Sequence, residues 1–146
     1  MTDRWFPDGM PNPMVDVASL PWWQAVAKQQ LTVQCCNECG HGQLPPAPIC
    51  SECRSTALQL KPVSGKGSLY TYSHVHQAVA MNQTLPFVLA IIELDVAGAC
   101  TNSVRMMSNI VIDTTTENDI GRSVEVVWEI MSEEVTVPRF RFSQQV

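Results

Sequence analysis

Five of the six cysteines lie within nineteen residues, in the stretch CCNECGHGQLPPAPICSEC from Cys35 to Cys53. This stretch contains two C-x-x-C pairs, Cys36/Cys39 and Cys50/Cys53, with ten residues between them. A C-x-x-C turn directs two sulfur atoms to one point, and two such turns facing each other provide the tetrahedral set of four sulfurs that Zn²⁺ prefers. Gly40 follows the first pair at a position where positive φ is useful. The spacing predicts a zinc ribbon, with a redox dithiol or an iron site in the same cage as alternatives.

The other two cysteines and His41 are not expected to bind the metal. Four thiolates fill the coordination sphere of zinc, so the metal would fold the chain without taking part in a reaction. His41 is therefore not needed as a ligand. We expect Cys35 to be a strand side chain that points away from the metal, and Cys100 to be a small buried hydrophobic residue.

The charge and hydropathy of the chain restrict its partners. The 146 residues carry a net charge of −5, and only nine are Lys or Arg, scattered from Arg4 to Arg141. Nucleic-acid binders usually carry a basic stripe, so nucleic acid is disfavoured. No run approaches the length of a membrane span, and the first fourteen residues do not resemble a signal peptide. The expected compartment is the cytoplasm, where clustered cysteines indicate metal more often than disulfides.

One amphipathic helix is predicted near the N-terminus. Ser19 is expected to cap it, Pro21 lies in its first turn, and the helix is expected to continue through residues 22–30. Trp22 and Trp23 fall with Val26 and Ala27 on one face. This face either packs on the rest of the chain or docks on a partner, since paired tryptophans are typical of interfaces.

Strand patterns dominate the rest of the chain. Strands are expected over 31–35 and 57–64 on either side of the cysteine stretch, and over five further segments: 68–76, 86–95, 99–107, 123–131 and 138–142. Residues 114–121 suggest a helical turn closed by Gly121. Five strands with this spacing favour a small antiparallel barrel of the OB-fold type. The expected fold is mainly β: an N-terminal arm and helix (1–33), a rubredoxin-like zinc ribbon (34–64) and a five-stranded OB-fold barrel (65–146).

Aromatic and imidazole side chains alternate along one predicted strand, at Tyr70, Tyr72, His74 and His76. Residues two apart on a strand share a face, so these rings would form a stripe about 20 Å long. The stripe is interpreted as a plain barrel surface, as a surface for a partner or an acyl-CoA channel, or as a stacking platform for single-stranded nucleic acid. No nucleophile motif or phosphate-binding glycine loop accompanies it, and no catalytic residue is assigned.

The order of these motifs resembles a known family, the acyl-CoA-associated proteins that combine a zinc ribbon with an OB-fold (domain of unknown function 35). The resemblance covers roughly residues 20–142 and rests on a set of short motifs: Trp22-Trp23, Cys36 to Gly40, Leu44-Pro45-Pro46, Cys50 to Cys53, Gly65 to Tyr72, Pro86 to Asp95, Ile120 to Val126 and Pro138 to Phe140. Cys35 and the connector 108–119 depart from the pattern.

The resemblance implies an accessory subunit. Relatives pair with thiolase-like proteins that make or break carbon–carbon bonds in CoA thioesters, such as the retro-aldol cleavage of a steroid side chain, and others pair with MaoC-like enoyl-CoA hydratases. It implies one structural Zn²⁺ on Cys36, Cys39, Cys50 and Cys53, a thiolase-like partner in a heterotetramer, and acyl-CoA at the shared interface. Trp22, Trp23, the Tyr70–His76 strand and the loop 77–85 are expected to face the partner or the acyl chain.

Overall fold

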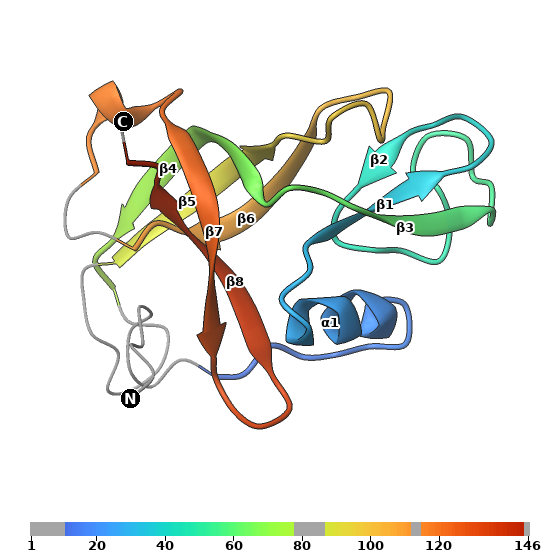
Figure 1. The fold of residues 1–146 in the computed structure, drawn as a ribbon, viewed down its shortest axis with the longest axis horizontal. Helices are drawn as coiled ribbons and strands as arrows, with labels where there is room; N and C mark the ends of the chain where they lie inside the picture. The colour runs from blue at the N-terminus through green and yellow to red at the C-terminus, as the bar shows by residue number, and fades with distance from the viewer. Residues whose placement is uncertain (1–10, 78–86, 112–114, 145–146) are drawn as a thin grey trace.

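The computed structural model describes residues 11–77, 87–111 and 115–144. Two antiparallel sheets lie at opposite ends of the molecule, with helix α1 (Leu20–Ala27) beside both of them (Figure 1). The smaller sheet has the order β2-β1-β3 and the larger one the order β6-β5-β4-β7-β8. Within the described residues, no helix is long and apolar enough to cross a membrane.

Helix α1 is shorter than predicted because it ends in a reversing turn. Gln29 adopts a φ of 57°, its N–H donates to the Val26 carbonyl, and the Gln30 N–H donates to the Ala25 carbonyl. These two bonds form a Schellman motif, which stops the helix although no glycine is present. Ser19 is the N-cap residue, as predicted, although its hydroxyl makes no capping bond. The Ser19 N–H instead donates to the Asp16 carboxylate at 2.7 Å.

The smaller sheet, here called the ribbon, carries the cysteine turns. It contains β1 (Thr32–Cys36), β2 (Gly42–Gln43) and β3 (Leu58–Pro62). The first C-x-x-C turn connects β1 to β2, and the second lies between β2 and β3. All five residues of β1 are buried, because this central strand is also covered by the larger sheet and the helix.

The larger sheet is a curled half-barrel of the OB-fold type, here called the barrel. Its strands are β4 (Lys66–Val75), β5 (Phe87–Leu94), β6 (Val104–Asn109), β7 (Ser123–Ile130) and β8 (Thr136–Phe142). The 3₁₀ turn Glu117–Asp119 precedes β7, close to the predicted position. Among the described residues, the two edge strands are joined where the Val111 N–H donates to the Phe140 carbonyl at 2.9 Å and the Ser108 hydroxyl donates to the Pro138 carbonyl at 3.0 Å. Further along, β6 and β8 diverge.

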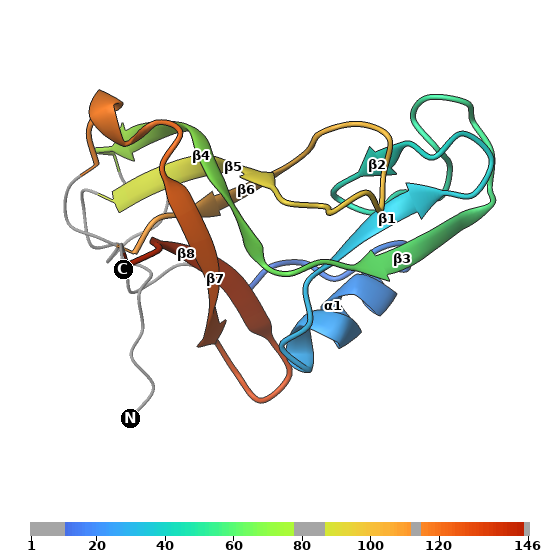
Figure 2. The same cartoon turned by 45° about the horizontal axis from the view of Figure 1, so that its top comes forward.

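Two features of the barrel differ from the sequence prediction. Residues 99–103 are not part of β6, which begins at Val104; they belong to a loop that leaves the barrel and reaches the ribbon (Figure 2). The predicted strict alternation of β4 is also wrong. Leu69 pairs with Ile92 and Thr71 with Ile91, so Tyr70 is the extra residue of a β-bulge.

One hydrophobic core joins the three parts of the chain. Alternate residues of β5 point inward, and they pack with buried side chains of the helix and the ribbon: Trp22, Val26, Leu31, Val33, Val88, Ala90, Ile92, Leu94 and Phe140. Because helix, ribbon and barrel share this core, their relative positions are fixed by packing.

Candidate functional site

The four cysteines of the C-x-x-C pairs converge on one point. Their sulfur atoms all lie within 4.8 Å of one another, with 3.5 Å between Cys36 and Cys53 and 3.7 Å between Cys39 and Cys50. Around a zinc ion with Zn–S bonds of about 2.3 Å, a regular tetrahedron has sulfur–sulfur edges of about 3.8 Å. The cage therefore fits a tetrahedral metal ion, and the predicted ligand set is brought together.

The backbone forms the two cysteine turns in the same way. The Gly40 N–H donates to the Cys36 carbonyl at 2.9 Å, and the Arg54 N–H donates to the Cys50 carbonyl at 3.0 Å. Gly40 has a φ of 77°, and Arg54 has a φ of 64°. A glycine suits the first of these positions, whereas the second places an arginine in the left-handed region. The repeated geometry presents both pairs of sulfur atoms to the same centre.

Backbone N–H groups favour the thiolate form of two ligands. The N–H of Cys39 is the main cause that lowers the pKa of the Cys36 thiol to about 6, and the N–H of Cys53 lowers the pKa of Cys50. The backbone N–H of Ser55 also acts to lower the pKa of Cys53, but desolvation and the three neighbouring cysteines outweigh it and raise the pKa to about 12. Four sulfurs this close cannot all be anionic without a cation between them. A bound metal ion would supply that cation.

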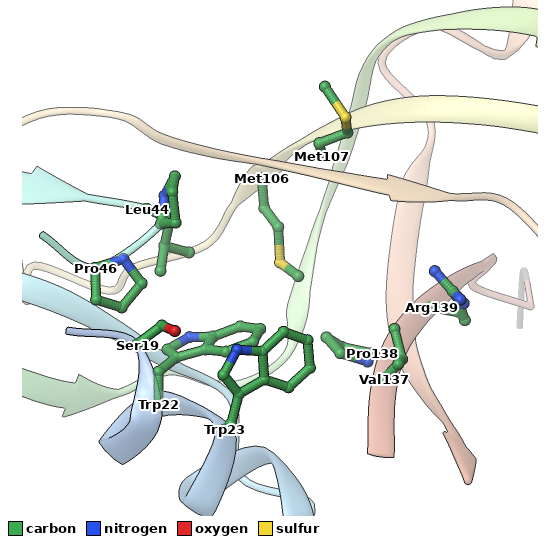
Figure 3. A pocket seen from close by; sticks show the side chains of 11 residues that line it. Ser19, Trp22, Trp23, Leu44, Pro46, Met106, Met107, Val137, Pro138 and Arg139 are labelled. Carbon is green, nitrogen blue, oxygen red and sulfur yellow. The ribbon is translucent and has the colours of Figure 1, made fainter. Parts of the chain in front are cut away.

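A groove of about 460 Å³ lies where helix, ribbon and barrel meet (Figure 3). It occupies the space between the diverging strands β6 and β8. Its lining is mostly apolar and comes from segments far apart in the sequence: Ser19, Trp22, Trp23, Leu44, Pro45, Pro46, Met106, Met107, Val137, Pro138 and Arg139. This volume is within the range of sites for small molecules or for the side chains of a partner.

The two predicted tryptophans have different positions in this groove. Trp22 is buried, and its indole N–H donates to the Thr32 carbonyl at 2.9 Å, which ties the helix to the ribbon. Trp23 is half-buried and meets Trp22 edge-to-face, with 4.8 Å between ring centroids. Met106 points toward these rings from the opposite wall (Figure 3). Trp22 is thus chiefly a core residue, whereas Trp23 offers accessible surface.

A buried ion pair supports one end of the groove. Arg139 of β8 donates from Nε to the Glu129 carboxylate of β7 at 3.1 Å, and the Glu129 side chain is only 1% exposed. Burial lowers the pKa of Arg139, while the hydrogen bond to Glu129 acts to raise it. This pair is not predictable from the sequence, because Glu129 and Arg139 alternate with apolar residues as in an ordinary strand.

The predicted Tyr/His stripe is broken by the bulge in β4. Tyr70 is exposed, and the Arg105 guanidinium lies 3.8 Å from its ring centroid. Tyr72, by contrast, packs against the core and meets the His74 ring edge-to-face at 5.4 Å. His74 Nε2 lies 2.8 Å from the Thr115 carbonyl, and His76 is exposed. Residues 78–85 of the predicted 77–85 loop lie outside the described residues.

The pairing of Cys35 with Cys100 was missed. Cys35 points away from the metal cage as predicted, but the structure bonds its sulfur to that of Cys100 in the loop after β5. Cys100 is therefore not simply a small hydrophobic residue. The two cysteines are 65 residues apart, and the sequence contains no local signal that would join them.

The fold and the cage define a protein that combines a four-cysteine ribbon with an OB-fold. The family model of the ChsH2 rubredoxin-like zinc ribbon domain matches residues 23–59, and that of the ChsH2 C-terminal OB-fold domain matches residues 60–129. A "DUF35 domain-containing scaffold protein" from Methanocaldococcus jannaschii is 35% identical over 102 residues, which cover 68% of this chain and 67% of that protein. The chain belongs to the ChsH2/DUF35 family.

Other relatives are subunits of larger assemblies. A "Probable enoyl-CoA hydratase alpha subunit" from Thermomonospora curvata is 28% identical over 131 residues; the match covers 90% of this chain and 39% of that protein. A chain in the solved structure of the "Ltp2-ChsH2(DUF35) aldolase" superposes with a TM-score of 0.74 at 28% identity, covering 89% of this chain and 98% of that one. A DUF35 protein of unknown function from Sulfolobus solfataricus, at 10% identity and a TM-score of 0.59, shares the fold.

Proposed function

We propose that this protein is an accessory subunit of a thiolase-like acyl-CoA enzyme that cleaves or forms carbon–carbon bonds in CoA thioesters. The observation that carries the proposal is the match to a chain of the Ltp2-ChsH2(DUF35) aldolase, which extends over almost the full length of both chains. A retro-aldol cleavage or a thiolysis in the partner's active site is the reaction class. The assembly is expected to be a heterotetramer in the cytoplasm.

The cysteine cage would hold one structural Zn²⁺ per chain. Cys36, Cys39, Cys50 and Cys53 supply four sulfur ligands, which fill a tetrahedral sphere. When bound, the ion neutralises the thiolates and fixes the two cysteine turns. The ribbon residues that line the groove, Leu44 to Pro46, lie between these turns. The metal therefore shapes the docking surface and takes no part in a reaction.

The groove and the Tyr/His strand are the proposed partner and acyl-CoA surfaces. Trp23 and Met107 offer accessible apolar area; Met107 is 64% exposed. Interfaces concentrate their binding energy in aromatic side chains and methionines of this kind. Trp22 acts by holding the helix in place, and Tyr70, Tyr72, His74 and His76 form a second and less apolar contact region.

A second candidate partner is an enoyl-CoA hydratase. It is favoured by the relatives from Thermomonospora curvata and Mycobacterium tuberculosis, which are named hydratase alpha subunits, the latter of 3-oxo-4,17-pregnadiene-20-carboxyl-CoA hydratase. This chain spans only 39% and 28% of their lengths, so their activity can reside in segments that have no counterpart here.

Affinity capture of the tagged chain from its own host, followed by native mass spectrometry, tests the proposal. A complex with a thiolase-like protein, with one zinc per small subunit, is the expected result. The variant Trp23→Ala should weaken the complex at least tenfold, whereas Ile120→Ala, an exposed apolar residue (49%) in the turn before β7, should not. A hydratase-like partner would favour the second candidate, and a protein that stays monomeric would overturn both.

A further inference from the structure

The loop between β5 and β6, residues 95–103, leaves the barrel and lies against the ribbon (Figures 1 and 2). We call it the clasp loop. Its Asn102 carboxamide brackets Gly42: the Gly42 N–H donates to Oδ1 at 2.6 Å, and Nδ2 donates to the Gly42 carbonyl at 3.0 Å. The Thr101 N–H donates to the Gly40 carbonyl at 2.9 Å, and Lys61 Nζ donates to the Ala99 carbonyl at 3.3 Å. The clasp loop thus contacts the ribbon at several independent points.

Cys35 and Cys100 form the covalent centre of this contact. Cys35 is completely buried in β1, Cys100 is half-buried in the clasp loop, and their Cα atoms are 6.1 Å apart. Successive residues of a strand point to opposite faces, so Cys36 faces the metal cage while Cys35 faces the barrel. The pair is therefore separate from the four metal ligands.

Gly42 permits the close approach of the clasp loop to strand β2. It pairs with Cys35 across the β1–β2 ladder. A Cβ atom built on Gly42 would collide with the Cys100 sulfur, and would lie 2.6 Å from Val104 Cγ2 and 2.8 Å from Cys100 Cβ. Such distances are not tolerated by real side chains, so only glycine lets the clasp loop come close enough for the two sulfurs to meet.

We propose that Cys35 and Cys100 are a thiol–disulfide redox site that locks the ribbon to the barrel, with a glutathione-class thiol as its reductant. In the opening reaction, a reductant thiolate attacks the more accessible Cys100 sulfur, the S–S bond breaks, and Cys35 leaves as a thiolate and takes up a proton. A second reductant thiol then attacks the mixed disulfide and releases the Cys100 thiol. The protein gains two electrons and two protons, and the two reductant thiols become a disulfide.

The Cys35–Cys100 disulfide affects the groove because it joins two walls of the groove. Cys100 is six residues before Met106 on one wall, and Cys35 pairs with Gly42, two residues before Leu44 on the other. Closing the disulfide holds these walls together, and opening it leaves them joined by hydrogen bonds and packing alone. Any effect on partner binding rests on the proposed function, whereas the redox chemistry does not.

The test uses the full-length, zinc-loaded chain equilibrated with reduced or oxidised glutathione. Alkylation and mass spectrometry should show Cys35 and Cys100 blocked together in the oxidised protein and both alkylated in the reduced one. Because the disulfide restrains 65 residues, the oxidised protein should melt roughly 4–16 °C higher. Zinc content should be the same in both states.

The matched variant is Cys100→Ala, which leaves the buried Cys35 and the metal ligands unchanged. It should melt at the temperature of the reduced wild type and should lose the redox-dependent shift. The proposal is overturned if Cys35 and Cys100 stay alkylatable in oxidised glutathione, if both wild-type states melt alike, or if Cys100→Ala keeps the shift. Since the wild type is compared with itself, a variant that fails to fold does not block the test. This test does not use partner capture, so its outcome does not depend on whether the proposed function is correct.

Discussion

Replacing both members of the buried ion pair between Glu129 and Arg139 should destabilise the protein by less than the sum of the two single replacements. Glu129 is 1% and Arg139 is 11% exposed, and the buried residues Val127 and Val137 pair across the strands with Arg139 and Glu129. Removing one partner takes from a buried charge the oppositely charged group that meets it at 3.1 Å, which costs about 3–5 kcal/mol. In a domain of this size, that corresponds to a Tm lower by roughly 6–20 °C.

The assay is a double-mutant cycle with Glu129→Leu, Arg139→Met and the double variant, each unfolded in urea and by heat. Each single variant should lose about 3–5 kcal/mol, whereas the double variant should lose less than their sum, since either single replacement already breaks the ion pair. The control is the pair Glu125/Arg141 on the same two strands, with an Nε–Oε1 distance of 2.8 Å and side chains 33% and 58% exposed. Its loss should cost at most about 1 kcal/mol. Single effects at 129 and 139 that simply add in the double variant would refute the reasoning.

Three further perturbations test other parts of the molecule. Trp22→Phe leaves the Thr32 carbonyl without its indole donor and should cost about 1–3 kcal/mol in urea unfolding, whereas Trp23→Phe should have little effect. Gly42→Ala forces the clasp loop away from β2 and should cost about 1–3 kcal/mol whether or not Cys35 and Cys100 are joined; an unchanged Tm would contradict the packing argument. Asp119 accepts a hydrogen bond from Arg122, the main cause of its lowered pKa, so it stabilises the fold above its ordinary pKa of 3.8, and this contribution is lost as the pH falls through the lowered value. Asp119→Asn should therefore melt below the wild type at pH 7, and the gap should close in acid; a gap independent of pH would show that the carboxylate charge is not involved.

The metal cage and most strands were predictable because their signals are local. The ligands Cys36, Cys39, Cys50 and Cys53 all lie within eighteen residues of sequence, and hydrophobic alternation marks β5 clearly. The bulge at Tyr70 was not predictable, since an extra residue on one strand depends on how the neighbouring strand pairs. Residues 99–103 have a composition that suits a strand, but the Thr101 N–H and the Asn102 side chain bond to the ribbon instead.

The groove and the redox site have the same origin, since both are made by segments that meet only after the ribbon and the barrel have docked. Trp22, Leu44, Met106 and Pro138 each look like ordinary core residues in their own segments, and only the fold assembles them around one space. A partner that seats in this groove contacts the helix, the ribbon and the barrel together, so its affinity depends on their relative positions. The cysteine cage lies at the base of the ribbon wall, the Trp22–Thr32 hydrogen bond fixes the helix, and the clasp loop fixes the ribbon to the barrel. A change at any of these supports should therefore alter assembly even when no residue in contact with the partner has been replaced.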